Sequence, residues 1–360
     1  MRNVIAKVSN IALHKKRPAS LVHFITNRCN ARCGHCFIDF DDKESQKASM
    51  KLADIEKLSK SLGPQIMNIN LTGGEPFLSA DIAAIATAYF TNSAIDSIYI
   101  TTHGGLTDRV KAFVQEIAPR FSDRKLIFSI SIDHLGERHN EARKVPNLFD
   151  DALRTYDFLK VYGRNVIPNV SITVSGTNCD DMDTIFDALV TEHGVTSLTS
   201  NIVRDEGVYI IPPQEKERIL AGYLRLNSRI ASSDELSGYD PGTLLGRMMN
   251  HKEAEVVRQI GEVYLEPRYV LPCRAGALLG IIYPNGDVYP CEILEDRPMG
   301  NLHDHDFDLL SLWDTAQSQE LRTWIRDTEC NCTFECAWSF NVLGSPRHQP
   351  GLALAALGRK

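Results

Sequence analysis

The chain reads Cys29-Asn-Ala-Arg-Cys33-Gly-His-Cys36 directly after a short apolar run. Three thiolates at this spacing can hold three irons of a four-iron cluster, whose usual protein complement is four cysteines. The missing fourth ligand would leave one iron open to an outside ligand, as the open position of a catalytic zinc site does. The alternative interpretation is a structural zinc site with His23 or His35 as the fourth ligand.

Outward from this loop, strand and helix signals alternate along residues 21–210. Runs rich in β-branched and aromatic residues are separated by stretches in which apolar residues recur at helical spacing, a pattern typical of parallel β-α-β construction. Six such units predict one parallel sheet. The predicted strands are residues 21–26, 66–71, 97–102, 125–132, 166–174 and 198–203, and the predicted helices are 50–62, a segment after 81, 107–119, 149–162 and 180–193.

Two further motifs stand where predicted strands end. The second strand ends in Thr72-Gly-Gly-Glu-Pro76, and the fourth ends in Ser131-Ile-Asp133. Barrel enzymes place their chemistry at the carboxyl ends of their strands. The thiol loop and these two motifs are therefore predicted to meet at one rim of the sheet.

This combination of motifs resembles the radical S-adenosylmethionine (SAM) superfamily over about residues 20–210. The resemblance implies an α/β fold, a partial (β/α)6 TIM-like barrel. It also implies a [4Fe–4S] cluster on Cys29, Cys33 and Cys36, whose open iron is chelated by the amino and carboxylate groups of SAM. Reductive cleavage of SAM would then yield a 5′-deoxyadenosyl radical that takes a hydrogen atom from a substrate carbon.

The resemblance further implies which residues contact SAM. His35 would lie against the adenine. Gly73 and Gly74 would let the backbone approach the methionine amino group, and Glu75 would accept a hydrogen bond from that region. The alternative for the two glycines is a simple turn.

Three residues near the fourth strand complete the predicted SAM site. Ser131 and Asp133 would face the ribose or the methionine carboxylate, and Arg143 would pair with that carboxylate through its fork of donors. A strand-end hydroxyl and a solvated charge are the alternatives for Ser131 and Arg143. Residues 169–176 lack the family's Gly-x-Ile-x-Gly-x-x-Glu adenine motif, and residues 101–104 resemble its Thr-Thr-Asn-Gly loop with His in place of Asn.

Five more cysteines cluster in the last quarter of the chain, where Gly286 precedes the second of them by five positions. This arrangement resembles the small cysteine-rich SPASM domain, or its shorter "twitch" form. Four of the five cysteines would bind one auxiliary [4Fe–4S] cluster, and the fifth would not be a ligand. A treble-clef-like zinc site is the alternative. We expect the ligands to be Cys273, Cys291, Cys332 and Cys336, with Cys330 able to replace Cys332.

Two side chains are candidates for catalysis. Glu292 directly follows Cys291, where related enzymes can have a carboxylate that takes a proton from the substrate. The alternative is a hydrogen-bonded Glu beside a cluster. Cys179 follows the fifth strand, and radical epimerases use a free Cys to return a hydrogen atom. The alternative for Cys179 is a small buried thiol.

Composition sets outer limits on the function. The chain has 360 residues, 43% apolar and 24% charged, which are globular values. The net charge is −7 and the Lys and Arg residues are scattered, so the sequence has no basic patch of the kind that binds nucleic acid. No apolar run approaches the roughly 18–20 residues that a membrane span needs. The N-terminus lacks a secretory apolar region, so we expect a cytoplasmic protein.

Five segments are predicted along the chain. They are an N-terminal extension (1–20), the barrel (21–210), a helical bridge (211–272), the auxiliary-cluster domain (273–345) and a C-terminal tail (346–360). Within the later segments we expect helices at 212–231, 244–263 and 309–327, and a hairpin at 280–289 around Pro-Asn-Gly-Asp.

The predicted function is hydrogen abstraction from a small molecule, such as a sugar, an aminocyclitol or another natural product, with net oxidation or epimerisation. Only about twenty residues precede the first strand, which leaves no room there for a fused leader-peptide-binding domain. A maturase of a ribosomally made peptide or protein is the first alternative. A non-enzymatic iron–sulfur or zinc scaffold is the second. An enzyme of this kind would take its electron from a flavodoxin or ferredoxin.

Overall fold

A computed structural model describes residues 3–204, 210–236 and 238–358. The outermost residues of the predicted extension and tail, residues 205–209 of the predicted barrel and residue 237 of the predicted bridge lie outside the described residues. Six parallel strands lie side by side in chain order, as the sequence predicts. They are β1 (Ser20–Thr26), β2 (Asn68–Gly73), β3 (Ser97–Thr102), β4 (Lys125–Ser131), β5 (Val166–Val174) and β6 (Leu198–Ile202).

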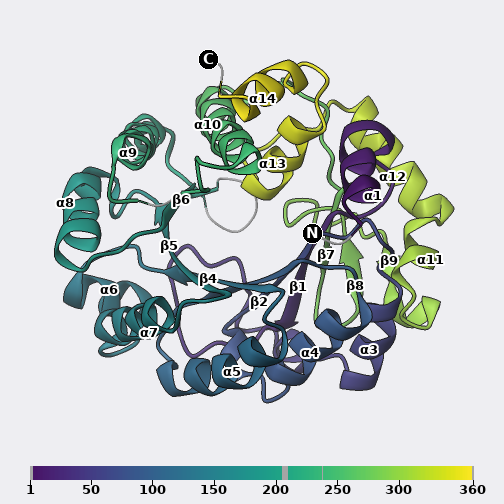
Figure 1. The fold of residues 1–360 in the computed structure, drawn as a ribbon, viewed down its shortest axis with the longest axis horizontal. Coiled ribbons are helices and arrows are strands. Elements are labelled where there is room, and N and C mark those ends of the chain that lie inside the picture. The colour runs from purple at the N-terminus through teal and green to yellow at the C-terminus, as the bar shows by residue number, and fades with distance from the viewer. Residues whose placement is uncertain (1–2, 205–209, 237, 359–360) are drawn as a thin grey trace.

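Helices cover the outer face of this curved sheet (Figure 1). Alternate residues of the strands, such as Ile98, Ile100 and Phe128, have no exposed surface. Their side chains share one face because successive strand residues point to opposite sides, and the helices bury that face. The covering helices are α3 (Leu52–Lys60), α4 (Ile82–Asn92), α5 (Thr107–Arg120), α6 (Gly136–Arg143), α7 (Leu148–Tyr162) and α8 (Met182–Asp187), which a π-helical turn, η4 (Ala188–Glu192), extends.

The sheet does not stop at β1. Strand β7 (Leu279–Ile282) pairs with β1 in parallel, and β8 (Asp287–Tyr289) and β9 (Gly300–Asn301) follow antiparallel. The result is one nine-stranded sheet in the order β6-β5-β4-β3-β2-β1-β7-β8-β9. The predicted hairpin at 280–289 is therefore confirmed, and it extends the barrel's own sheet.

The predicted helices near the auxiliary region are present, with one difference. Helices α9 (Pro213–Ser232) and α10 (Leu244–Leu265) match the predictions. The single helix predicted at 309–327 is two, α11 (Leu309–Trp313) and α12 (Ala316–Asp327). Thr315 between them is extended, and its side chain accepts a hydrogen bond from the Ser318 amide to cap α12.

Several short elements have no counterpart among the predictions. Helices α13 and α14 pack on α10, and Figure 1 shows these three at the top of the view, across from α3 to α5. No helix in the described ranges is long and apolar enough to cross a membrane. The additional elements are α1 (Val4–Ser9), η1 (Asn10–His14), α2 (Lys43–Lys47), η2 (Pro76–Leu78), η3 (Cys179–Asp181), η5 (Leu302–His305), α13 (Glu335–Leu343) and α14 (Gln349–Ala356).

Candidate functional site

The three N-terminal cysteines occupy one short loop after β1. The Cys36 amide donates to the Cys33 carbonyl at 3.2 Å, and the Ala31 amide donates to the Cys29 sulfur at 3.3 Å. From the end of α6, Arg143 Nη1 lies 3.6 Å from the Cys33 sulfur. Backbone turns thus hold the thiols near one another and next to a positive charge.

The thiols fit an iron–sulfur cluster. Burial raises the pKa of all three, that of Cys29 to about 11, and Cys33 and Cys36 add to the shift at Cys29 because they lie close by. Thiolates in such a site need a metal to be stable. Within the described parts of the chain, no three Cys, His, Asp or Glu side chains converge as the ligands of one ion do. In a cluster each thiolate binds a different iron, so this arrangement suits a cluster better than zinc.

Two glycines fix the loop against β2. Gly73 has φ +140°, and a Cβ there would collide with the Thr26 carbonyl oxygen. A Cβ on Gly74 would collide with the Arg28 carbonyl, while the Gly74 amide donates to Thr26 O at 2.8 Å. The glycines therefore bring the end of β2 against the start of the thiol loop. Their predicted approach to SAM stays a prediction.

Glu75 has no exposed surface and lies at the centre of a hydrogen-bond network. Its carboxylate accepts from the Phe77 amide at 3.0 Å, the Thr102 hydroxyl at 2.8 and 2.9 Å and the His103 amide at 2.9 Å. The His103 ring reaches Asn30 Oδ1 of the thiol loop at 2.8 Å. Glu75 thus ties the ends of β2 and β3 together, and its contact with SAM remains a prediction.

Asp133, Arg143 and His35, which the resemblance names as SAM contacts, lie close to one another. Arg143 Nη2 donates to Asp133 Oδ2 at 2.5 Å, and the Thr173 amide donates to Asp133 Oδ1 at 2.8 Å. His35 Nε2 lies 4.0 Å from the same carboxylate. The ends of β4, α6, β5 and the thiol loop therefore meet here.

The protonation states of Asp133 and His35 follow from burial and from the neighbouring charges. Burial would raise the pKa of Asp133, but the nearby Arg143 and His35 lower it to about 2. Burial lowers the pKa of His35, and Asp133 only partly opposes this. At neutral pH the carboxylate is charged and the imidazole is neutral, which suits packing against an adenine. Arg143 Nε is buried, has no hydrogen-bond partner within the described ranges, and could donate to an added carboxylate. Ser131, half-buried at the end of β4, lies opposite Ser171 of β5.

The auxiliary cysteines form a second group. A hydrogen bond joins Cys273 and Cys330, raising the pKa of Cys273 and lowering that of Cys330 to about 7. The charge of Cys332 raises the pKa of Cys273, and the charge of Cys330 raises the pKa of Cys291. Cys330, expected only as a replacement ligand, thus lies against Cys273, while Cys273, Cys332 and Cys336 pack in the same apolar cluster as Cys291.

Cys336 also lies next to a group of charged side chains. Burial and then Glu292 and Glu335 raise its pKa to about 12, while Arg204 opposes them. Arg204 Nη2 donates to Glu292 Oε2 at 2.7 Å. Glu335 accepts from the Ile202 amide at 3.1 Å, and burial raises its pKa to about 7. The predicted candidate Glu292 therefore belongs to a buried polar cluster at the end of β6.

Arg204 also connects the two cysteine groups. Its guanidinium lies over the rings of Phe37, directly after Cys36, and Phe334, with centroid distances of 5.7 and 5.1 Å. Arg204 and Glu335 were not predicted from the sequence. Only the position of Arg204 just after the sixth predicted strand could have indicated it.

Cys179 lies in η3 with no exposed surface. Its backbone and Cβ pack against Gly222 of α9, where a Cβ would collide with them. Burial raises the pKa of the thiol. The hydrogen-donor role of Cys179 stays a prediction.

Comparison with known proteins agrees with this geometry. Residues 24–189 match the family model described as the radical SAM superfamily, and residues 273–337 match SPASM, described as an iron–sulfur cluster-binding domain. The chain is similar to native anSMEcpe with bound AdoMet, with a TM-score of 0.59, 18% identity and coverage of 93% of this chain and 99% of that one.

Two curated relatives differ in how much of the chain they match. Fe-coproporphyrin III synthase of Methanosarcina barkeri (strain Fusaro / DSM 804) is 29% identical over 195 residues, which is 49% of this chain and 45% of the relative. Mycofactocin maturase MftC of Mycolicibacterium smegmatis (strain ATCC 700084 / mc(2)155) is 26% identical over 286 residues, 76% of this chain and 64% of the relative. The matched segments thus span less than two thirds of either relative.

These domains imply a [4Fe–4S] cluster that binds SAM and an auxiliary iron–sulfur centre. With both family models matched in chain order on one continuous sheet, the chain belongs to the radical SAM superfamily and carries a C-terminal SPASM domain.

Proposed function

We propose that this chain is a radical SAM enzyme that abstracts a hydrogen atom from a carbon of a polypeptide substrate. The observation that carries the substrate class is the similarity to mycofactocin maturase MftC over 76% of the chain. The similarity to the coproporphyrin synthase covers only 49% of the chain. The net reaction would be an oxidation, crosslink or epimerisation.

Different residues at the carboxyl ends of the strands would bind the cluster and SAM. Cys29, Cys33 and Cys36 would hold the cluster, and the buried charge of Arg143 beside Cys33 favours its thiolate. The unpartnered Nε of Arg143 would donate to the SAM carboxylate. With SAM, such a cluster supplies one-electron cleavage that leads to removal of a substrate hydrogen.

Glu292 is the proposed proton acceptor on the substrate side. A general base must lie within hydrogen-bond reach of the proton that it removes. Arg204 holds the Glu292 carboxylate at 2.7 Å from its Nη2, and this contact fixes the direction of the side chain. In the auxiliary site we propose Cys273, Cys291, Cys330 and Cys332 as ligands, because Cys330 is hydrogen-bonded to Cys273, and Cys273 and Cys332 pack in the same cluster as Cys291.

The inner face of the barrel supports a second candidate, a small hydroxylated molecule such as a sugar or aminocyclitol. This face carries hydroxyl and amide side chains that are only partly buried, opposite the apolar face under the helices. Thr101 Oγ1 donates to Asn70 Oδ1 at 3.3 Å, and Asn201 Nδ2 donates to Ser171 Oγ at 3.1 Å. Such groups would bond equally well to sugar hydroxyls. We also propose a flavodoxin or ferredoxin as electron donor and the cytoplasm as compartment.

The two substrate classes can be separated by mass spectrometry. The anaerobic, reduced protein is incubated with SAM and either a short peptide encoded beside its gene or a panel of aminocyclitols and sugars. We expect a modified peptide, coupled to 5′-deoxyadenosine, and no modification with Cys29, Cys33 and Cys36 replaced by Ala. Oxidation or a crosslink lowers the peptide mass by the lost hydrogens, and epimerisation in heavy water raises it by the deuterium that is returned. Turnover of a sugar or aminocyclitol alone would replace the polypeptide with the second candidate. A protein that never forms 5′-deoxyadenosine would instead be an iron–sulfur or zinc scaffold.

A further inference from the structure

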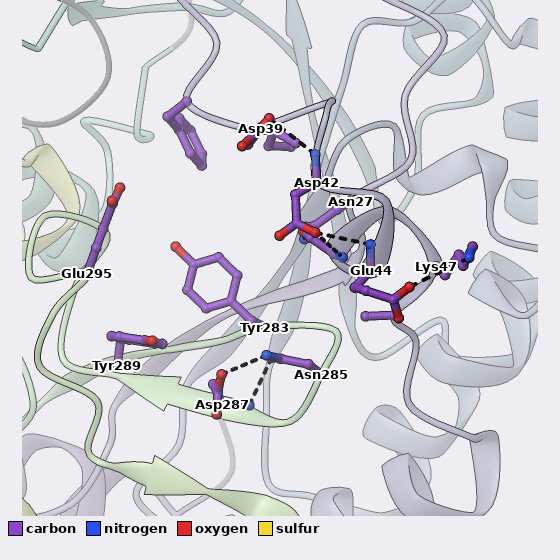
Figure 2. Close-up of a pocket in the computed structure, with 14 residues that line it drawn as sticks. Asn27, Asp39, Asp42, Glu44, Lys47, Tyr283, Asn285, Asp287, Tyr289 and Glu295 are labelled. Carbon is purple, nitrogen blue, oxygen red and sulfur yellow. Dashed lines mark hydrogen bonds and ion pairs between the residues drawn. The ribbon is translucent and has the colours of Figure 1, made fainter.

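A cavity of about 650 Å³ lies beside the thiol loop, outside the network of Asp133 and Arg143. One wall is the segment after Cys36, from Phe37 to the start of α2. The other wall is the β7–β8 hairpin and Glu295. Figure 2 shows Tyr283 at its centre, with Glu295 and Tyr289 on one side and Asp42 on the other.

The lining of this cavity is strongly acidic. Five carboxylates and one ammonium group line it. The ammonium group, on Lys47, lies 3.7 Å from the carboxylate of Glu44 and so is already paired. The remaining lining carboxylates are those of Asp39, Asp42, Asp287 and Glu295.

Two of these carboxylates use only one oxygen within the protein. Asp39 Oδ1 accepts from the amides of Asp41 and Asp42 at 2.8 and 3.3 Å. Asp42 Oδ1 accepts from the amides of Glu44 and Ser45 at 3.0 and 3.1 Å, capping α2. Among the described residues, the second oxygen of each carboxylate accepts no hydrogen bond. The backbone thus holds both acids in place and leaves one oxygen of each for a ligand.

Asn27 provides independent support for a binding site. It lines the cavity from the end of β1, and only 9% of it is exposed. Its Nδ2 donates to Ser45 Oγ at 2.6 Å, which orients the amide. Its Oδ1 is buried and accepts no hydrogen bond from any residue that the structure describes. A buried acceptor without a donor is costly, and a bound N–H group would remove that cost.

The walls favour an organic cation over a metal ion. No three acidic, Cys or His side chains in the described ranges converge as ligands of one metal ion. The cavity is far larger than one ion and has aromatic walls, where Tyr283 stacks on Phe24 at 4.8 Å and meets Tyr289 edge-on at 5.4 Å. Aromatic faces attract ammonium and guanidinium groups and cover their alkyl chains.

We infer that this cavity is a binding site for an organic cation, an ammonium or guanidinium group carried on an alkyl chain or a carbon ring. Asp39, Asp42 and Glu295 would supply the opposite charge, Asn27 Oδ1 would accept an N–H, and Tyr283 would contact the chain. Two sources carry this chemistry: a Lys or Arg side chain of a polypeptide, and a free amine such as an aminocyclitol.

Calorimetric titration of the anaerobic full chain at low salt tests this site. The peptide probe is acetyl-Gly-Arg-Gly-Lys-Gly-amide, and the free amine is 2-deoxystreptamine. We expect binding of at least one probe that weakens as salt rises. The same peptide with citrulline and acetyl-lysine, which carries no charge, should not bind. Binding of the peptide alone assigns the cation to a polypeptide, and binding of the amine alone assigns it to a small molecule.

Two double variants that remove the same charge, one in the cavity and one elsewhere, test whether the probe binds in the cavity. Asp39→Asn with Glu295→Gln should weaken the bound probe about tenfold, because two ion pairs are lost. Asp157→Asn with Glu320→Gln removes the same charge from exposed positions on α7 and α12 and should leave affinity unchanged. Absence of binding by both probes, or equal loss in both double variants, would overturn the inference. Because the titration uses neither SAM nor reductant, such a failure would leave the proposed radical chemistry standing.

Discussion

His23 shows what burial does to a single residue of the barrel. It lies on β1, 1% exposed, with Nδ1 at 2.8 Å from the Tyr89 hydroxyl. Burial lowers its pKa to about 3, far below the 6.5 of an exposed histidine. The folded protein therefore holds this ring neutral, whereas the unfolded chain protonates it below pH 6.5.

A pH dependence of stability follows from this difference. Between pH 6.5 and about 3 the unfolded chain binds one proton more than the folded chain at His23, so stability falls by about 1.4 kcal/mol per pH unit as the pH drops. We expect His23→Phe to reduce the slope of unfolding free energy against pH by one proton, measured by denaturant unfolding from pH 7 to 5. Tyr89→Phe removes the same hydrogen bond but keeps the histidine, so it should keep the slope. A full slope in His23→Phe would contradict the buried neutral ring.

At the residue scale, the sequence predicts which cysteines share a site better than it predicts which charged side chains pair. The three thiols of the loop are neighbours in sequence, so their spacing alone indicates a shared site. Asp133 and Arg143 were predicted separately, and their ion pair depends on α6, whose sequence has no apolar stripe. Arg204 and Glu335 meet only because α13 packs near the end of β6. Such pairings arise from tertiary packing, which no local pattern records.

At the scale of elements, the contact between the loop after β1 and the end of β2 can be tested by substitution at Gly74. A Cβ at Gly74 would strike the Arg28 carbonyl, where the backbone has little freedom to move. We expect Gly74→Ala to lose about 2 kcal/mol of stability and part of the iron of the thiol loop. Gly34→Ala is the matched control, because a Cβ at Gly34 meets nothing within 4 Å. Equal iron and stability in the two variants, measured by iron assay and denaturant unfolding, would count against this contact.

Two cysteines in the segment between α12 and α13, and a third in the first turn of α13, differ in the side chains that they contact. Cys330 lies against Cys273, whereas Cys336 lies among Glu292, Glu335 and Arg204. We expect Cys330→Ser to lower iron from about eight to about four per chain, and Cys336→Ser to keep about eight. The measurement is iron and sulfide per chain after anaerobic purification. The reverse result would restore Cys336 as a ligand, as first expected from the spacing.

The sequence predicts long elements well and short ones poorly. All six barrel strands and helices α9 and α10 have strong apolar periodicity and were predicted near their observed bounds. Helix α2, Lys-Glu-Ser-Gln-Lys, has no apolar residue, and its start depends on the Asp42 cap. Short helices of this kind depend on capping and packing more than on their own sequence.

At the scale of the whole molecule, the auxiliary domain completes the barrel sheet. Strand β7 pairs with β1 along residues 279–282, and a second apolar cluster joins Val22 and Phe24 to Phe340. Without these partners β1 would present an open edge and an apolar face to water. Barrel and auxiliary domain should therefore fold as one unit.

Truncation tests that dependence. We expect a chain that ends at residue 272 to aggregate or to lose near-ultraviolet circular dichroism, because β1 loses its neighbour β7. A chain that ends at residue 348 lacks only α14 and keeps β7 to β9, so it should stay monodisperse in gel filtration. A monodisperse, native-like chain ending at 272 would show that the barrel folds alone.

The central claim is that the thiol loop of this chain binds a cluster that cleaves SAM. The most direct measurement is 5′-deoxyadenosine formed from SAM by the anaerobically purified protein after reduction, beside the variant with Cys29, Cys33 and Cys36 replaced by Ala. We predict 5′-deoxyadenosine from the intact chain and none from the variant, which should retain about four irons in the auxiliary site. Zinc without iron after attempted reconstitution, or equal 5′-deoxyadenosine from both proteins, would contradict the account.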